Sequence, residues 1–414
     1  MSNRHHTAPA PQSGYRPGVT VVMATYNRAR FLPEALQSLL AQTVPPTRIV
    51  VIDDGSTDGT GDALAPFVDR IEYIRQENGG KARALNRVLP TVDTEFVWFF
   101  DDDDAAYPDA LAKLLETLHG DPTCGFAFGA FDVGQSEAGS LLAAAKRPAP
   151  YLHAEKTATW QRLELFRACT LMMSGALIRT AAVRAVGGLN EALIRGQDYD
   201  LMLRLAAHFP FRYCGSSVYV WREHDGARGS AAERHAHDDR IRAWARYNAP
   251  IGDYLRTRLP LALFQPDDDT TLDCARARRK ALIVRAWAIA NKLPAAATAA
   301  DLCAAFEADA ITPLDQDERR LLEQLFHHDF VVYRLPIPLR ALTRLLGCAP
   351  GCAALIQLAR GLYWLGHAQR LSWRKTHLLS RAALLYALGR CAALWHRPTG
   401  RAHAAAGTQP TSQR

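Results

Sequence analysis

Four consecutive carboxylates, Asp101–Asp104, directly follow the apolar run Phe96–Phe100, and this junction strongly restricts what the chain can form. The run predicts a buried strand, and four carboxylates at its end repel one another unless a cation or hydrogen-bond donors compensate them. In an open α/β sheet, ligands bind outside the carboxyl ends of the strands. The junction therefore predicts a divalent-metal site for a phosphorylated substrate, with a solvated turn before Pro108 as the alternative.

Two upstream runs, Val19–Met23 and Ile49–Ile52, are short and β-branched, as buried parallel strands are. The first leads through a polar loop into Phe31–Gln42, whose leucines recur at helical spacing. The second leads into Asp53–Thr60, whose glycines permit a tight turn. Strand-like and helix-like patterns then alternate as far as about Phe128, which predicts βαβ units and a mostly parallel sheet with three polar strand ends at one edge.

Five motifs carry a resemblance to a known family. In order and spacing, four of them resemble the N-terminal half of the family-2 glycosyltransferases of the GT-A fold: Thr25-Tyr26-Asn27-Arg28, Asp53-Asp54-Gly55-Ser56, Asn78-Gly79-Gly80 and Asp101–Asp104. Gly196–Arg204 resembles the late acidic motif that supplies the catalytic base of the inverting members. The resemblance runs from about Val19 to about Ser230 and implies an α/β fold, with a GT-A-like, Rossmann-like sheet sandwiched by helices.

The resemblance implies a set of donor-binding side chains at the strand ends. The Tyr26 ring is suited to stacking on a nucleobase, and Asp54 is the expected reader of uracil, with Asp53 as its neighbour. The Gly79–Gly80 turn enters a helix whose amides and basic side chains suit an anion, although an ordinary helix start explains the turn equally well. The full predicted set is Thr25, Tyr26, Asn27, Arg28, Asp53, Asp54, Lys81, Arg83, Asp101 and Asp102.

The acidic run matches the family's Asp-x-Asp pair. The resemblance implies that Asp101 and Asp103 bind Mg²⁺ or Mn²⁺, which stabilises the negative charge of a leaving nucleoside diphosphate. His224, in the segment Trp221-Arg222-Glu223-His224, is the third predicted metal ligand. Asp104 is expected to cap the helix that begins near Tyr107.

Asp198 is the predicted general base, which deprotonates the acceptor hydroxyl during inverting transfer. Gln197 stands where many relatives have an acidic residue, so a tuned carboxylate pair is not expected. The alternatives are that Asp198 only caps the helix containing Leu201, or that Asp200 is the base.

Length and composition predict more than one structural unit. The chain has 414 residues, of which 48% are hydrophobic, and this length exceeds what one domain usually holds. Its eight cysteines are scattered and no hydrophobic N-terminal signal is evident, which predicts reduced thiols and a cytoplasmic protein. The predicted units are a disordered tail (1–16), the glycosyltransferase domain (17–234, with a mobile acceptor-side loop near 132–150), a helical extension (235–333) and a basic amphipathic helical region (334–414).

The C-terminal region is strongly basic. Residues 330–414 contain eleven Arg, one Lys and no acidic residue, so the rest of the chain carries a net charge of −5 against +7 for the whole. Arg370, Arg374, His377 and Arg381 recur on one helical face beside apolar side chains, as in helices that bind anionic membranes. Arginines interrupt every apolar window that is long enough to span a bilayer. The region predicts peripheral attachment to the inner face of the cytoplasmic membrane, or else a packed helical subdomain.

The predicted function is transfer of a sugar, with inversion, from a nucleotide-sugar donor, expected to be a UDP-sugar, to a hydroxyl of a glycan, lipid or glycoconjugate. Such a transfer belongs to cell-surface polysaccharide biosynthesis. A nucleotidyltransferase would also use strand-end carboxylates and metal, but the late acidic motif disfavours it. The non-enzymatic alternative is a basic module that binds membrane or nucleic acid; we expect no nucleic acid, because such a module needs no acidic cluster.

Overall fold

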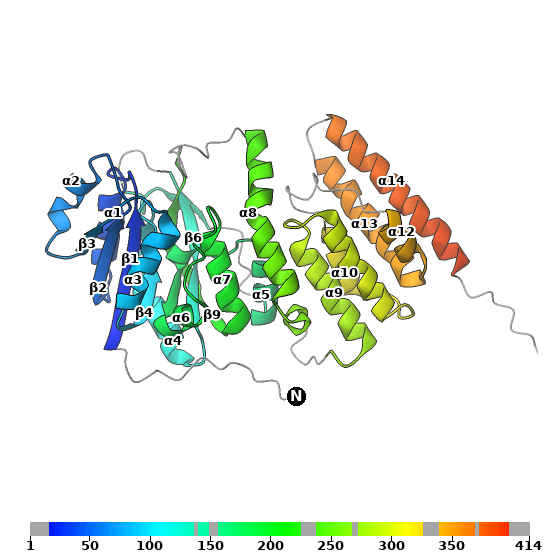
Figure 1. The fold of residues 1–414 in the computed structure, drawn as a ribbon, viewed down its shortest axis with the longest axis horizontal. Coiled ribbons are helices and arrows are strands. Elements are labelled where there is room, and N and C mark those ends of the chain that lie inside the picture. The colour runs from blue at the N-terminus through cyan, green and yellow to red at the C-terminus, as the bar shows by residue number, and fades with distance from the viewer. Residues whose placement is uncertain are drawn as a thin grey trace, which may run out of the picture.

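The computed structural model describes residues 16–135, 140–148, 156–224, 237–266, 272–325, 339–368 and 372–396. A sheet covered by helices forms one end of the molecule, and a group of helices forms the other, with α8 (His237–Thr257) running between them (Figure 1). The predicted disordered tail lies outside the described residues except for Arg16, which begins the first strand.

Within the described residues, one sheet runs in the order β3-β2-β1-β4-β8-β6-β9-β5, with β7 paired to β6. β3, β2, β1 and β4 are parallel, as expected, whereas β8 is antiparallel to both of its neighbours and makes the sheet mixed. The strands are β1 (Arg16–Thr25), β2 (Arg48–Asp53), β3 (Glu72–Arg75), β4 (Thr94–Phe99), β5 (Ala105–Ala106), β6 (Phe126–Gly134), β7 (Ala145–Pro148), β8 (Ala176–Arg179) and β9 (Phe211–Arg222).

The predicted mobile loop at 132–150 is partly wrong. Ala145–Pro148 forms β7, which pairs antiparallel with the end of β6, because a turn at residues 141–144 folds the chain back on itself. Residues 136–139 and 149–150 of the predicted loop lie outside the described residues.

Strand register brings the polar loops together. Thr25 pairs with Asp53, and Val22 pairs with Phe99, so β1, β2 and β4 end within a few residues of one another. Because these strands are parallel, the loops that follow them lie at the same edge of the sheet. The sheet therefore presents the first, second and fourth motifs side by side.

Helices cover both faces of the sheet, which confirms the predicted sandwich (Figure 1). Side chains alternate along the strands, so Val21 and Val22 belong to separate buried clusters on the two faces of the sheet. The helices of this domain are α1 (Leu32–Leu40), α2 (Thr60–Leu64), α3 (Lys81–Val88), α4 (Ala110–Gly120), α5 (Ala158–Arg167), α6 (Thr180–Ala185) and α7 (Gln197–His208).

The helices that follow α8 share the core of one sheet face. Ile283 and Trp287 of α9 belong to the same buried apolar cluster as Val22 and Phe166, so the core continues from the sheet into this region. These helices are α9 (Ala275–Ile289), α10 (Ala295–Ala308) and α11 (Gln316–Gln324). From here on, the term helical extension refers to residues 272–325, the part of the predicted unit (235–333) that contains α9, α10 and α11.

An ion pair ties α9 to α11 inside the helical extension. Arg279 and Glu318 are both 0% exposed, and the guanidinium donates to the two carboxylate oxygens at 2.8 Å each. Glu318 also completes a capping box with Asp315 at the start of α11. The pair therefore anchors the start of α11 to α9.

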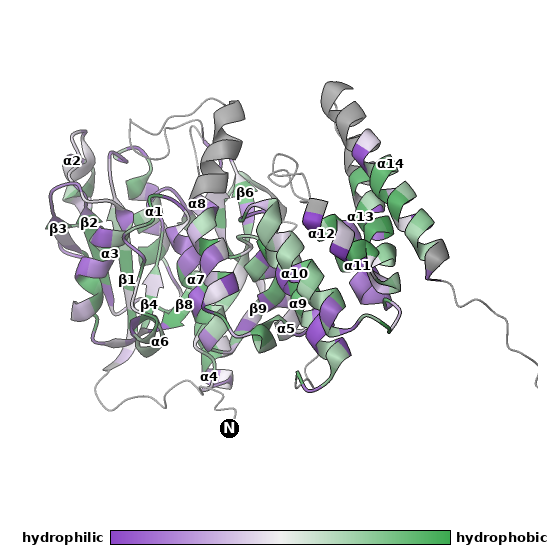
Figure 2. Ribbon diagram, turned by 45° about the vertical axis from the view of Figure 1, so that its right-hand side comes forward, coloured by the Kyte–Doolittle hydropathy of each residue, from purple (hydrophilic) through white to green (hydrophobic). Residues whose placement is uncertain are grey.

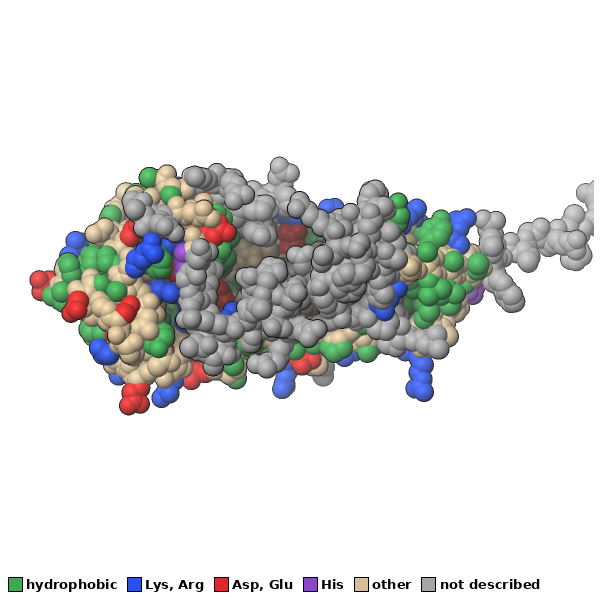
Figure 3. All heavy atoms as spheres, turned by 90° about the horizontal axis from the view of Figure 1, so that it is seen from above, with side chains coloured by type: hydrophobic (Ala, Val, Ile, Leu, Met, Phe, Trp, Pro, Cys, Tyr) green, Lys and Arg blue, Asp and Glu red, His purple; other side chains and the backbone are tan. Residues whose placement is uncertain are grey.

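Three helices form the C-terminal region: α12 (Leu339–Leu346), α13 (Ala349–Ala368) and α14 (Ser372–Trp395). α13 is mostly buried between α11 and α14, while Leu384 (58% exposed) and Tyr386 (45% exposed) on α14 face outward. Figure 2 shows that the described side chains of α14 are mainly apolar, and Figure 3 shows hydrophobic and basic side chains together at this end of the molecule. Among the described helices, none alone meets the length and hydropathy of a membrane span; α12 and α13 meet them only as a pair bent by 119°.

Candidate active site

The loops after β1 and β2 are tied to each other by Asn27. Its backbone adopts a positive φ of 54°, its amide donates to Ser56 Oγ at 2.9 Å, and its side-chain oxygen accepts from the Thr57 amide at 2.8 Å. Thr25 is buried at the end of β1, whereas Tyr26 is 43% exposed. The structure therefore places Tyr26 on the surface of the joined loops, where its ring is open to a ligand.

Asp53 and Asp54 are buried and hold neighbouring backbone. Asp53 accepts from the Ser56 amide at 2.7 Å and from the Tyr73 hydroxyl at 2.8 Å. Asp54 accepts from the amides of Gly79 and Gly80 at 2.9 and 2.7 Å, and from the Gln76 side chain at 2.8 Å. Any contact of Asp54 with a base would share an oxygen that already holds the glycine turn.

α3 begins at this turn and points Lys81 at the acidic run. Gly80 has a φ of +89°, a conformation that glycine adopts without strain, and Lys81 is the next residue. Lys81 forms an ion pair with Asp101. Although burial opposes it, the charges of Asp101 and Asp198 raise the pKa of Lys81. Arg83, two residues further along α3, is exposed and lies over Gly79.

The acidic run forms a compact cluster that includes Asp104. Carboxylate oxygens of Asp101, Asp103 and Asp104 lie within 4.8 Å of one another. Asp104 is 1% exposed and accepts from Ser174 Oγ and from the Arg222 amide, each at 3.1 Å. The prediction that Asp104 caps the next helix is wrong, because Ala105 and Ala106 pair with β9 and α4 begins only after Asp109.

Crowding and burial make this cluster electrostatically unfavourable without a cation. Burial and the Asp103 charge raise the pKa of Asp102 to about 7. The same two causes, with the Asp101 charge, raise the pKa of Asp104 well above its usual value. Hard carboxylate oxygens at this spacing match the ligands that Mg²⁺ and Mn²⁺ prefer. The residues therefore fit a divalent metal, with Asp104 as a candidate ligand that the sequence analysis missed.

Basic and aromatic side chains border the cluster. His224 Nε2 lies 3.0 Å from Asp103 Oδ2, and the His224 ring packs against Phe31 at 4.8 Å between centroids. His224 thus contacts one member of the cluster. Arg28 Nε lies 3.9 Å from carboxylate oxygens of both Asp102 and Asp103. Arg222, almost fully buried, pairs with Glu34 and donates to the Asp103 carbonyl at 2.8 Å.

Asp198 lies in the first turn of α7, near the same charges. Burial raises the pKa of Asp198, the Lys81 charge opposes that shift, and the Asp101 charge adds to it. These couplings place the carboxyl of Asp198 beside the Lys81–Asp101 pair, although about 100 residues separate it from both in sequence. Its oxygen also accepts from the Tyr199 amide at 2.9 Å.

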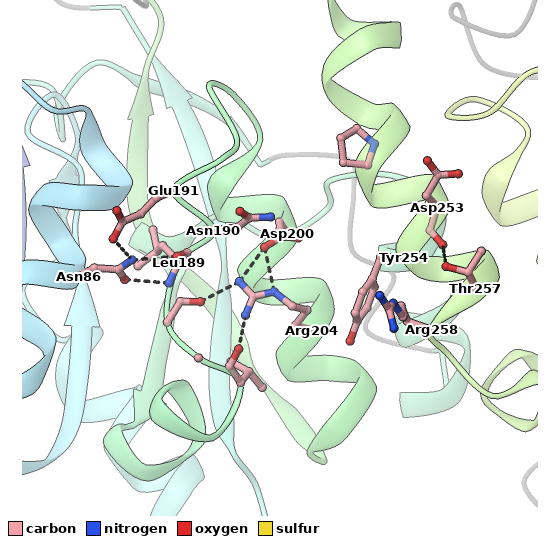
Figure 4. A pocket seen from close by; sticks show the side chains of 14 residues that line it. Asn86, Leu189, Asn190, Glu191, Asp200, Arg204, Asp253, Tyr254, Thr257 and Arg258 are labelled. Atoms are coloured by element: carbon pink, nitrogen blue, oxygen red, sulfur yellow. Dashed lines mark hydrogen bonds and ion pairs between the residues drawn. The ribbon is translucent and has the colours of Figure 1, made fainter.

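Asp200, the alternative candidate for the base, is already paired with an arginine. It is 5% exposed and forms a bidentate pair with Arg204 at 2.8 and 2.6 Å. It lines a separate cavity of about 800 Å³ between the loop at 186–191, α7 and α8 (Figure 4). Two residues along a helix correspond to a rotation of roughly 200°, so Asp198 and Asp200 point to different sides of α7. Of the two carboxylates, Asp198 is therefore the one that lies beside the Lys81–Asp101 pair.

A further segment completes the site, and no sequence motif marks it. Ser174, in the 3-10 turn Met173–Gly175 before β8, is 0% exposed and accepts from the Asp101 amide at 3.1 Å while it donates to Asp104. Cys169 lies earlier in the same segment, and desolvation of its sulfur, followed by the charge of Asp198, raises the pKa of its thiol. Residues 168–175 therefore form a wall of the site between the cluster and Asp198.

The sequence was compared with models of known families. Residues 20–179 match the model of glycosyl transferase family 2. This range contains the joined loops, Lys81, the acidic cluster and Ser174, and it ends before Asp198.

Two curated relatives illustrate the similarity. An uncharacterized glycosyltransferase of Rickettsia felis is 29% identical over 228 residues, which are 52% of this chain and 35% of the relative. The putative teichuronic acid biosynthesis glycosyltransferase TuaG of Bacillus subtilis is 31% identical over 153 residues, 36% of this chain and 57% of TuaG. This chain therefore spans only part of the length of either relative.

Two solved structures align with most of this chain. TarS 1–349 of S. aureus aligns with 91% of this chain and 90% of its own, at 13% identity and a TM-score of 0.48. The mannosyltransferase PcManGT of Pyrobaculum calidifontis, in complex with GDP-Man and Mn²⁺, aligns with 94% and 90% of the two chains at 21% identity and a TM-score of 0.45.

Proposed function

We propose that this protein, whose residues 20–179 match the model of glycosyl transferase family 2, transfers a sugar, with inversion, from a nucleotide-sugar donor to an acceptor hydroxyl. One juxtaposition supports this reaction above all. The fold brings Asp198, a carboxyl with a raised pKa, beside Lys81 and the Asp101–Asp104 cluster, although about 100 residues separate them in sequence. An inverting transfer requires a base next to a site for the diphosphate.

The donor would lie along the joined loops. The exposed Tyr26 ring offers a stacking surface for the nucleobase, with Arg28 and Lys81 on the side of the diphosphate. Uracil is the base we propose. Asp53 and Asp54 would act mainly by fixing the loop and the glycine turn against which the base lies.

Asp101, Asp103 and Asp104 would hold Mg²⁺ or Mn²⁺, with His224 acting through Asp103. The bound ion supplies charge stabilisation to the leaving diphosphate. Lys81 and Arg28 add positive charge on the same side.

In the transfer step, Asp198 takes the proton of the acceptor hydroxyl as the oxygen forms its bond to the anomeric carbon. The bond from that carbon to the diphosphate oxygen breaks on the opposite face, and the nucleoside diphosphate leaves with the electron pair. Burial raises the pKa of Asp198, which makes its carboxylate a stronger base for this proton transfer. The naming of TuaG favours a cell-surface glycan or its lipid-linked precursor as the acceptor.

A donor screen tests the proposal. The purified chain is incubated with UDP-, GDP- and dTDP-sugars, acceptor glycans and Mn²⁺, and the released nucleotide is identified. We expect nucleoside diphosphate release that chelation abolishes. Release of pyrophosphate would instead identify a nucleotidyltransferase.

Asp198→Asn tests the base. Its amide keeps the size and polarity of the side chain, so donor affinity by calorimetry should be unchanged, while transfer should fall by about a hundred- to ten-thousand-fold. Asp253→Asn is the control, because Asp253 is an exposed carboxylate on α8 in the separate cavity. A loss smaller than about tenfold for Asp198→Asn, or an equal loss for the control, would rule out this assignment.

We further propose that α14 attaches the protein peripherally to an anionic membrane on the cytoplasmic side. Leu384 and Tyr386 are exposed on this helix, Arg390 is exposed near them, and no acidic residue follows Asp329. Apolar side chains beside basic ones suit the interface of an anionic bilayer. Attachment there would place the catalytic site near a lipid-linked acceptor.

A further inference from the structure

The wall of the site at residues 168–175 is anchored at both ends. At one end, Ser174 bonds to the Asp101 amide and the Asp104 carboxylate. At the other end, α5 finishes at Arg167, whose side chain points away from the site into the helical extension. The position of the wall therefore depends on what holds Arg167.

The helical extension holds Arg167 by its side chain. Arg167 is 7% exposed. Its guanidinium carbon lies over the Trp287 ring, 4.7 Å from the ring centre, and the group donates to the Trp287 carbonyl. It also donates to the carbonyls of Gln324 and Leu325 at 3.1 and 3.2 Å. These contacts connect the end of α5 to both α9 and α11.

The helical extension also holds the Arg167 backbone, through Lys292. This residue is 0% exposed and follows α9 by three positions. Its ammonium donates to the carbonyls of Arg167 and Ala288 at 2.6 and 2.9 Å and to the Asn291 side-chain oxygen at 2.8 Å. The Asn291 amide donates to the same Arg167 carbonyl at 2.8 Å. Three acceptors match the three N–H groups of an ammonium, so the contacts favour the charged form.

Lys292 also contacts the helix that carries Asp198. Its Nζ lies 5.6 Å from the centre of the Tyr199 ring, within cation–π range. The Tyr199 hydroxyl in turn donates to the Phe166 carbonyl at 3.0 Å. Tyr199 directly follows Asp198 in the first turn of α7, so one ammonium touches both the start of the wall and the start of the helix that bears the base.

Burying a cation is unfavourable, and the cost is large here. Burial, and then repulsion from the Arg167 guanidinium, lower the pKa of Lys292 well below its usual value. Leucine or methionine would fill the same space without that penalty. A costly buried lysine at the junction of the wall and α7 points to a role in the geometry of the site.

We propose that Lys292 is a positioning residue for the transfer reaction: by fixing the Arg167 carbonyl and the Tyr199 ring, it sets the distance between Asp198 and the acidic cluster. The inference rests on the proposed function, because it assigns Asp198 the role of base. It implies that the helical extension is part of the active-site architecture, although none of its residues needs to touch the donor.

The test compares three variants by the kinetics of transfer and by donor affinity. Lys292→Met removes the ammonium and keeps the volume of the side chain. We expect kcat to fall by about tenfold or more, because misplacement of a catalytic group by about 1 Å costs up to about a hundredfold. Donor affinity by calorimetry should stay within about twofold, since the donor loops lie on β1, β2 and β4.

Lys280→Met is the matched control, because Lys280 is also a mostly buried lysine of α9 but pairs with Asp317 at 3.2 Å, away from the wall. It should lower thermal stability and leave kcat unchanged below the melting temperature. A purely structural role for Lys292 predicts that both variants behave alike, which would overturn the proposal.

Tyr199→Phe keeps the test decisive if Lys292→Met fails to fold. It removes only the hydroxyl that bonds to Phe166, and we expect a smaller fall in kcat with unchanged donor affinity. If both variants fold, their effects on kcat should be non-additive in the double variant, because they act on one contact network. An unchanged kcat in Tyr199→Phe and Lys292→Met, with an active parent chain, contradicts the positioning role. An inactive parent chain contradicts the proposed function instead.

Discussion

Asp102→Asn should make the metal-free protein more stable at neutral and alkaline pH. Asp102 is 9% exposed, and burial with the Asp103 charge raises its pKa to about 7. An unfolded aspartate has a pKa of about 3.9, so ionising this side chain in the folded chain at about pH 8 costs about 4 kcal/mol. Asparagine keeps the shape of the side chain and removes that cost.

The gain in stability should depend on pH, because ionisation of Asp102 is costly only in the folded chain. A carboxyl whose pKa is raised on folding binds its proton more tightly in the folded chain, so stability falls as the pH rises from about 4 to about 7. Asp102→Asn should therefore add about 2–4 kcal/mol to the free energy of unfolding at about pH 8. The range extends below about 4 kcal/mol because the substitution also removes the ion pair with Arg28, whose Nε lies 3.9 Å from Asp102. At about pH 4 the side chain is protonated in the folded chain and about half protonated in the unfolded chain, so the difference should be no more than about 0.5 kcal/mol.

The assay is urea unfolding in the presence of a chelator at both pH values. Asp109→Asn is the control, because Asp109 is an exposed carboxylate of the same segment that pairs with Lys113 at 2.8 Å, and its replacement should change stability by less than about 0.5 kcal/mol. A loss of stability in Asp102→Asn at about pH 8, or an equal gain at both pH values, would refute the electrostatic reasoning.

Two other predictions concern the helical regions. Arg279→Met should reduce the free energy of unfolding in urea by about 3–5 kcal/mol, because it leaves Glu318 charged and buried without its partner. The Arg279→Met/Glu318→Met double variant should recover part of that loss in the same assay. Leu384→Glu on α14 should abolish cosedimentation with anionic liposomes at low salt. The control Ile311→Glu, at an 88% exposed position outside α14, should bind like the parent. Binding by Leu384→Glu at the parent level would contradict the membrane proposal.

Local signals were sufficient to predict the strands and the loops that follow them. Val19–Met23 and Ile49–Ile52 lie within β1 and β2, and the predicted helix at Phe31–Gln42 is α1, because β-branched runs and leucine spacing report directly on local structure. The parallel order of these strands then fixes where the polar loops meet. The cluster at Asp101–Asp104 and its neighbour Lys81 follow from this arrangement.

Long-range contacts decided what the sequence could not predict. Asp104 joins the cluster because β5 pairs with β9 more than 110 residues later, and no pattern near Asp104 reports that pairing. Ser174 lies in a segment without periodicity, and its role depends on β8 lying beside β4. No local sequence pattern distinguishes Lys292 from any other lysine near the end of a helix. Its contact with Arg167 arises from the packing of α9 against α5.

The sheet and the helical extension share one core, so this chain cannot be cut between them without exposing apolar side chains. A boundary at residue 234 follows the end of the family resemblance, but a cut there would remove the partners of Phe166 and Arg167 and expose the apolar side of α5 to water. The catalytic domain is therefore not a module that can be moved alone into a chimera. A donor-specificity swap between relatives should exchange the loops at the strand ends and keep α5, α7 and residues 272–325 from one parent.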